Sequence, residues 1–285
     1  MKKIDIGKYI ERFIDSVSQG GEPFFDGVTS FIEGIVEGFQ AILLYPPQVV
    51  IIALIALIAY FVNAGGFKKS FTKKGWKNGR GVGIFTILGL LLLWGMDFWE
   101  ETMQTLALVI SSAIIALIIG IPLGIWSARS DKVEKVVRPI LDFMQTMPAF
   151  VYLIPAILFF SVGNVPGVVA TVVFSLPPAV RLTNLGIRNV PGEVVEASYS
   201  FGCSSRQLLY KVQIPLAMPT ILAGVNQVIM LALSMVVIAS MVGAAGLGEK
   251  VYMGILQADV GLGFEAGLGI VVLAIILDRV TQALG

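Results

Sequence analysis

The sequence predicts an all-α polytopic membrane protein, and three observations support that fold class. Of its 285 residues, 56% are hydrophobic and only 14% are charged, and the mean hydropathy is +0.86. Soluble domains contain about 25% charged residues and could not bury so much apolar surface. Seven apolar segments approach the length of about 20 residues that a membrane-spanning helix needs. Lys and Arg also gather between alternate segments, as on the cytoplasmic side of membrane proteins.

Residues 1–40 are expected to form an extracytoplasmic amphipathic segment. Every third or fourth residue from Phe24 to Phe39 is apolar, and acidic residues lie between them. This spacing predicts a helix that lies in the membrane interface instead of crossing the bilayer. A loosely packed, partly disordered tail is the alternative.

Residues 41–101 are expected to hold two peripheral transmembrane helices, at about 41–62 and 82–99, joined by a basic cytoplasmic loop. The Lys68–Arg80 cluster in that loop would attract anionic lipid, and salt screens such attraction over about 8–10 Å. The cluster is therefore a candidate sensor of ionic strength. Its alternative role is to set the orientation of the chain in the membrane, which needs only the positive charge.

Residues 102–285 are expected to form the core of the protein. Most of the 20 Lys and Arg residues fall in the loops after the first, third and fifth segments. This asymmetry places the N-terminus outside and the C-terminus in the cytoplasm, in agreement with seven spans. The third span carries small residues at intervals of four, from Ser112 to Ala128, which predicts close approach of another helix. The five core spans are predicted at 105–126, 143–162, 165–180, 219–243 and 264–283.

Composition also excludes several functions. The chain has no His and one Cys, Cys203, so a His-dependent triad, a His metal site and an intrachain disulfide are impossible. A net charge of +1 provides no basic surface for nucleic acid. No G-x-x-x-x-G-K-[ST] sequence is present, so the chain lacks the loop that would let it hydrolyse ATP. We expect a membrane protein that is not an enzyme and holds no cofactor or metal.

The segment 184–219 is predicted to form a helical elbow on the cytoplasmic side, because it is too long for a simple connector. Gly202 lies where one short helix would end in a left-handed residue. Ser204 and Gln207 have the spacing of a capping box that starts a second helix. Pro215 is expected to end that second helix. A rigid elbow of this kind suits docking of another protein.

The elbow resembles a known signature. Glu196-Ala197, Gly202 and the run from Val212 to Pro215 follow the spacing of the E-A-A-x3-G-x9-I-x-L-P motif, with three mild substitutions. This motif marks the permease subunits of binding-protein-dependent ABC importers. Residues 142–152 and 230–248 also resemble the permeases of glycine betaine and proline uptake systems. The similarity covers roughly residues 100–283.

The resemblance implies a type I ABC importer transmembrane fold in the cell membrane. Its implied partners are an ATP-binding cassette ATPase subunit that carries ATP and Mg, an extracellular substrate-binding protein, and a second permease copy in a homodimer. The lipid bilayer is the remaining partner. The resemblance assigns ATPase coupling to Glu196, Ala197, Gly202 and Pro215.

The translocation path has weaker signals. Gln145, Asn226, Gln227 and Ser234 are neutral polar residues in apolar segments, and each could equally form hydrogen bonds between helices. The resemblance implies import of a compatible solute for osmoprotection, with glycine betaine first and choline, carnitine or proline betaine as alternatives. An ion-coupled secondary transporter is the alternative class. It is disfavoured because spans three to six lack ionisable residues in their apolar cores.

Overall fold

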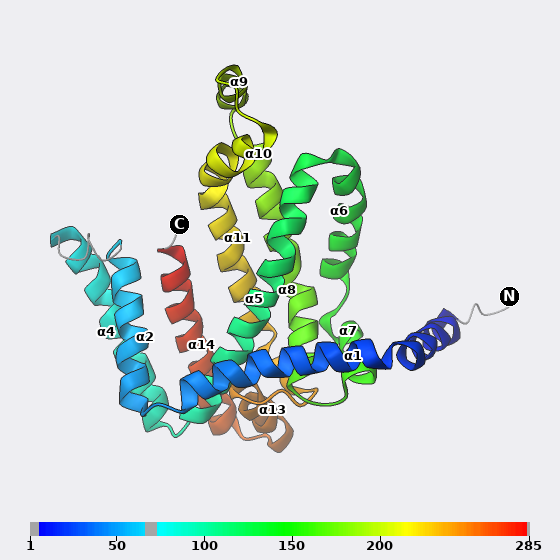
Figure 1. Ribbon diagram of the computed structural model, residues 1–285. Helices are drawn as coiled ribbons and strands as arrows, with labels where there is room; N and C mark the ends of the chain where they lie inside the picture. The colour runs from blue at the N-terminus through cyan, green and yellow to red at the C-terminus, as the bar shows by residue number, and fades with distance from the viewer. Residues whose placement is uncertain (1–5, 66–72, 284–285) are drawn as a thin grey trace.

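The computed structural model describes residues 6–65 and 73–283, and the side chains of residues 20–65 and 79–283. All regular structure in these residues is helical, which confirms the predicted all-α class (Figure 1). The helices are α1 (Ile6–Leu44), α2 (Gln48–Asn63), α4 (Lys73–Gly95), α5 (Trp99–Arg129), α6 (Asp131–Thr146), α7 (Ala149–Phe160), α8 (Asn164–Arg188), α9 (Gly192–Ser200), α10 (Ser205–Leu208), the π-helix η1 (Leu209–Gln213), α11 (Ile214–Ser234), α12 (Val236–Ser240), α13 (Leu247–Gln257) and α14 (Val260–Gln282).

The helices form a bundle whose two ends carry different elements. Helices α5, α8, α11 and α14 run between them, and α2 and α4 form a hairpin at one side (Figure 1). Helices α9 and α10 project from one end, and the C-terminus points toward that end. Helix α1 lies across the opposite end, where α7 and α13 are also found (Figure 1). The connection between α5 and α6 and the expected elbow therefore share one end, and α1 lies at the other.

Among the described residues, five helices are long and apolar enough to cross a membrane, or six if the bent pair α6 and α7 counts as one. The prediction of one continuous span at 143–162 is wrong. Helices α6 and α7 meet there at 98°. Met147 is extended (φ −70°, ψ 135°), as residues that precede a proline prefer, and Pro148 caps α7 without making a side-chain hydrogen bond. The chain therefore turns sharply after Thr146.

The hydroxyl of Tyr152 stabilises this bend. It lies 2.6 Å from the carbonyl oxygen of Met147 and also contacts the carbonyl oxygen of Met144. The last carbonyls of a helix have no partner within the helix, so this contact satisfies groups that α6 leaves open. Tyr152 thus connects the two helices across the bend.

The small residues of α5 pack against α8, which confirms the close approach predicted for that stripe. A β-carbon on Gly120 would lie 2.6 Å from the β-carbon of Ala179. One on Gly124 would lie 2.7 Å from the carbonyl oxygen of Val180. Real β-carbons do not approach so closely, so the two helices touch at a distance that only glycine allows. Helix α5 runs continuously through Pro122.

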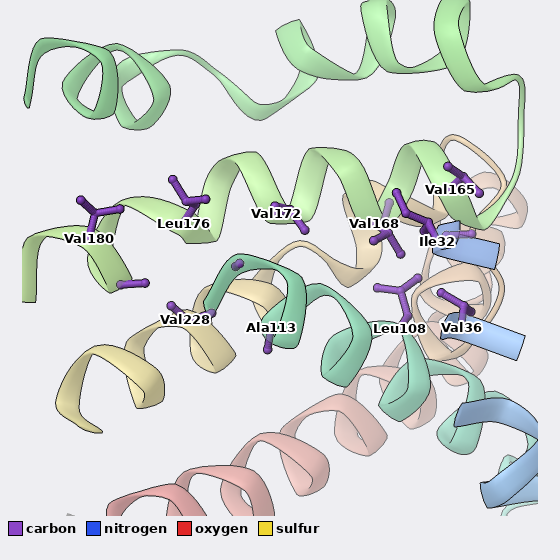
Figure 2. Close-up of a cluster of buried hydrophobic side chains, with 14 of the residues drawn as sticks. Ile32, Val36, Leu108, Ala113, Val165, Val168, Val172, Leu176, Val180 and Val228 are labelled. Carbon is purple, nitrogen blue, oxygen red and sulfur yellow. The ribbon is translucent and has the colours of Figure 1, made fainter. Parts of the chain in front are cut away.

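The largest core cluster surrounds this contact (Figure 2). Side chains of α8 such as Val168 and Val180 pack with Leu108 of α5 and Val228 of α11. Ile32 and Val36 of α1 join the same cluster, so the N-terminal helix is anchored to the core through its inward side. Phe24 and Phe31 on α1 stay exposed. The residues of α1 that this cluster buries, Ile32 and Val36, therefore lie beside the predicted apolar stripe and not in it.

Candidate functional site: the elbow and the polar groups of the bundle

The elbow is shorter than the predicted range 184–219. Helix α8 continues to Arg188, and η1 joins α10 to α11 without interruption. Only residues 189–204 form a separate unit. This unit, which we call the elbow loop, contains α9, none of whose residues is buried. The predicted range 184–219 was too long because the polar and charged residues in the last turns of α8 resemble the residues of a loop.

Gly202 ends α9 in the left-handed conformation, as predicted, with φ +79°. Its N–H donates to the carbonyl of Tyr199 at 2.8 Å, and the N–H of Cys203 donates to the carbonyl of Ser198 at 3.1 Å. These two bonds are those of a Schellman cap, which satisfies the open carbonyls at the end of a helix. Residues with a side chain pay an energetic cost at such a φ angle, so glycine is the residue that the turn requires.

The second predicted cap is also confirmed. The Gln207 side chain accepts from the N–H of Ser204 at 2.9 Å. In return, the Ser204 hydroxyl accepts from the N–H of Gln207 at 3.4 Å. This is a capping box. Because the Schellman cap and the capping box lie within a few residues of each other, the angle between α9 and α10 is held from both sides.

The prediction that Pro215 ends the second helix is wrong. Pro215 lies in the first turn of α11, and helical structure continues from α10 through η1 to Ser234. A proline inside an α-helix clashes with the carbonyl four residues earlier. The π-helical turn at Leu209–Gln213 immediately precedes it, and such wider turns interrupt the regular α-helical bonding. The elbow loop is therefore joined to α11 by uninterrupted helical structure through α10 and η1.

The elbow loop presents acidic and aromatic groups to the solvent. Glu196 and Ala197 are exposed, and the described residues offer the Glu196 carboxylate no hydrogen bond or ion pair. Phe201 is 89% exposed, and Tyr199 and Tyr210 are exposed as well. Exposed aromatic residues are enriched at protein interfaces; Tyr199 and Phe201 belong to the elbow loop, and Tyr210 belongs to η1. The sequence prediction missed these aromatics. The position of Tyr199 and Phe201 next to Gly202, at an exposed turn, could have indicated that their rings face the solvent.

The four residues predicted for the path do not form one site. The side chain of Gln145 accepts from Arg181 at 2.5 Å. Asn226 donates to Asp278 at 3.2 Å and accepts from Thr281 at 2.5 Å, which joins α11 to α14. Gln227 and Ser234 are exposed on α11, and Ser234 donates to its own helix. Gln145 and Asn226 therefore serve as interhelical contacts.

Arg181 and Arg188, expected in the cytoplasmic loop, lie in α8 and bind α6. Arg181 forms an ion pair with Asp142 at 2.6 Å. Arg188 forms ion pairs with Asp131 at 2.7 Å and Glu134 at 3.0 Å. Leu141 is the one buried residue of α6, and Val137 and Met144 pack partly buried against the same core, so α6 is held by apolar contacts together with these partly exposed ion pairs.

The described residues contain no group of three metal-ligating side chains, and Cys203 is a free thiol. The Lys68–Arg80 cluster, apart from Arg80, lies outside the residues whose side chains are described.

Similarity to characterised proteins decides the family. Residues 120–285 match the family described as binding-protein-dependent transport system inner membrane component. The chain belongs to this family. This permease is 53% identical over 280 residues to the glycine betaine/carnitine transport permease protein GbuB of Listeria monocytogenes, covering 98% of this chain and 95% of that one. It is 50% identical to the glycine betaine/proline betaine permease ProW of Escherichia coli, covering 99% of this chain and 75% of that one.

The fold is that of a type I ABC importer permease. A chain of the inward-facing MetNI methionine ABC transporter superposes with a TM-score of 0.58 at 22% identity, covering 64% of this chain and 93% of that chain. The protein is thus a multi-pass permease subunit of the inner membrane and is not itself catalytic. A binding-protein-dependent ABC transporter works with an ATPase and a binding protein, so both are partners of this permease.

Proposed function

We propose that this permease imports a quaternary amine, with glycine betaine as the principal solute, for osmoprotection. The observation that carries the mechanism is the doubly capped elbow loop around Gly202, which lies in the ABC permease signature and whose helix α9 has no buried residue. The solute is supported by the relatives, several of which are named for glycine betaine transport. Choline, carnitine and proline betaine are the alternative solutes.

The elbow loop would dock on the ATPase, with Glu196, Ala197 and Gly202 as coupling residues. Glu196 offers an unpaired carboxylate to a basic group of the partner, and Phe201 offers apolar area. Because η1 joins the elbow loop to α11, motion of the ATPase would reach the bundle through that helix. Pro215 would contribute by keeping this junction π-helical.

The orientation that accompanies this proposal places the elbow loop and the C-terminus in the cytoplasm and the N-terminus outside. The shorter helices α2 and α4 would complete about seven crossings with α5, the bent pair α6 and α7, α8, α11 and α14. Helix α1 would lie in the outer interface, although its part Gly20–Leu44 is also long and apolar enough to cross a membrane. A homodimer of permeases would receive solute from an extracellular binding protein. Gln227 and Ser234, exposed on α11, are the predicted path residues that can still face this passage.

Reconstitution in proteoliposomes tests the proposal. The permease is purified with its ATPase and combined with its binding protein, and ATP hydrolysis and solute uptake are measured. Glycine betaine should stimulate both more strongly than choline, carnitine or proline betaine does, and an ionophore should leave uptake unchanged. Uptake without ATP, abolished by the ionophore, would instead establish the ion-coupled carrier and refute the proposal.

The Lys68–Arg80 cluster remains a candidate ionic-strength sensor. Replacing its Lys residues by Gln should flatten the salt dependence of uptake, because the attraction to anionic lipid is screened by salt. An unchanged salt profile would leave the cluster with its role in orientation alone.

A further inference from the structure

A short segment at the end of the bundle opposite the elbow loop is fastened to other helices. Residues 241–246, which we call the strap, join α12 to α13, and α13 lies at the end that α1 crosses (Figure 1). Val242 and Ala244 of the strap are buried. Loops are usually more mobile than the helices they connect, so burial of these side chains indicates a segment that is held in place.

Two side chains from distant parts of the chain bind the strap and the start of α13. The side-chain oxygen of Asn164, the first residue of α8, accepts from the N–H of Ala245 at 3.0 Å. The hydroxyl of Thr105 on α5 accepts from the N–H of Leu247 at 2.8 Å, and both of these residues are fully buried. The strap is therefore attached to α8 on one side and to α5 on the other.

An ion pair connects the same two helices, α5 and α13, at the surface. Nζ of Lys250, in the first turn of α13, lies 3.1 Å from Oε1 of Glu101 on α5, and the two side chains are only partly buried. Gly246 of the strap also touches α5, since a β-carbon there would lie 2.5 Å from the hydroxyl oxygen of Thr105. Partly exposed ion pairs are weak, so this contact can break and form again at small cost.

The strap is also connected to the elbow loop at the opposite end of the bundle. Helices α10, η1 and α11 form uninterrupted helical structure from Ser205 to Ser234. Met235 keeps helical backbone angles (φ −83°, ψ −11°), and α12 follows it and leads into the strap. One helical run therefore joins the surface proposed for ATPase docking to the segment that α5 and α8 hold.

We propose that the strap is the outer gate of the transporter and that the polar contacts just described form the latch that keeps it shut. The inference rests on the proposed function, in which solute arrives at this end and the ATPase acts at the other. Movement of the elbow loop would pass along α11 to the strap and release the latch. Because coupling between two sites is reciprocal, a weaker latch should favour the ATPase state that opens the gate, even without the binding protein.

The test measures ATP hydrolysis by the purified permease–ATPase complex without binding protein. Glu101→Gln should raise this basal rate about threefold, which is within the range of a partly exposed ion pair. Thr105→Val should raise it about tenfold, because the buried N–H of Leu247 loses its partner. Exchange of the two charges, in Glu101→Lys combined with Lys250→Glu, should return the rate toward that of the parent, which loss of stability alone would not do.

Glu100→Gln is the matched control, because it removes the same charge from the neighbouring position of α5. Its carboxylate is exposed and binds Gln104 of its own helix, so the basal rate should not change. A covalent lock tests the gate directly. Glu101→Cys and Lys250→Cys, combined with Cys203→Ser, are cross-linked by a short bis-methanethiosulfonate. The cross-link should abolish uptake in proteoliposomes, relative to the Cys203→Ser parent, and a reductant should restore it.

Two results would overturn the proposal. Equal basal rates in Glu101→Gln and Glu100→Gln would show that the ion pair does not hold a gate. Uptake at the parent rate after cross-linking would show that α13 and the strap need not leave α5. Failure of the proposed function is distinguishable, because it would appear in the parent as uptake independent of ATP, whereas failure of the gate appears only in the comparison of variants.

Discussion

Replacing Gly202 by Val should uncouple the transporter while the permease still inserts in the membrane. Gly202 has φ +79°, where a residue with a side chain is strained by roughly 1–3 kcal/mol. A β-carbon there would meet no atom within 4 Å, so the cost is backbone strain alone. The α9–α10 turn can relieve it only by abandoning the left-handed residue and the Schellman cap. At about 1.4 kcal/mol per factor of ten, a strain of about 2 kcal/mol lowers the equilibrium ratio of the native to the rearranged elbow loop about 30-fold.

The assay compares solute-stimulated ATP hydrolysis and uptake in proteoliposomes, normalised to the amount of inserted permease. Gly192→Val is the matched control, because Gly192 starts α9, has no positive φ, and would meet no atom within 4 Å of a new β-carbon. Gly202→Asn should retain more activity than Gly202→Val, since Asn tolerates the left-handed conformation. Normal stimulation in Gly202→Val, equal to that of Gly192→Val, would refute the reasoning.

Three further predictions concern the stability of the permease, measured as thermal unfolding in detergent. Gly124→Ala should lower the free energy of unfolding by about 1–3 kcal/mol, because the added methyl group would overpack against α8. Gly38→Ala is the control, since a β-carbon there would meet no atom within 4 Å. Equal melting temperatures of the two variants would contradict the tight contact between α5 and α8. Tyr152→Phe should lower the free energy of unfolding by about 1 kcal/mol, because it removes the hydroxyl that binds the carbonyl of Met147 at the bend. An unchanged melting curve would show that this hydroxyl does not stabilise the bend. Ser204→Ala should lower the free energy of unfolding by about 1 kcal/mol, because it removes the side-chain half of the capping box. Ser205→Ala removes no cap and is the control. Equal melting temperatures of the two variants would show that the capping box does not stabilise the permease.

Local chemistry explains why much of the elbow loop was predictable. The left-handed Gly202 and the Ser204–Gln207 capping box depend on residues a few positions apart. The small residues of α5 likewise predicted a close contact, although not its partner α8. Pro215 was misjudged because the preceding π-helical turn accommodates it, and the pattern of residue types does not distinguish a π-helix from an α-helix.

By itself, the sequence determined the all-helical membrane class and the geometry of the elbow caps. These properties follow from composition and from contacts between near neighbours. Only the tertiary structure decided that the segment 143–162 bends by 98°, that α1 lies across the end of the bundle (Figure 1), and that Arg181 and Arg188 bind α6. The ion-pair partners of Arg181 and Arg188 are tens of residues apart, so these contacts become visible only when packing brings α6 and α8 together.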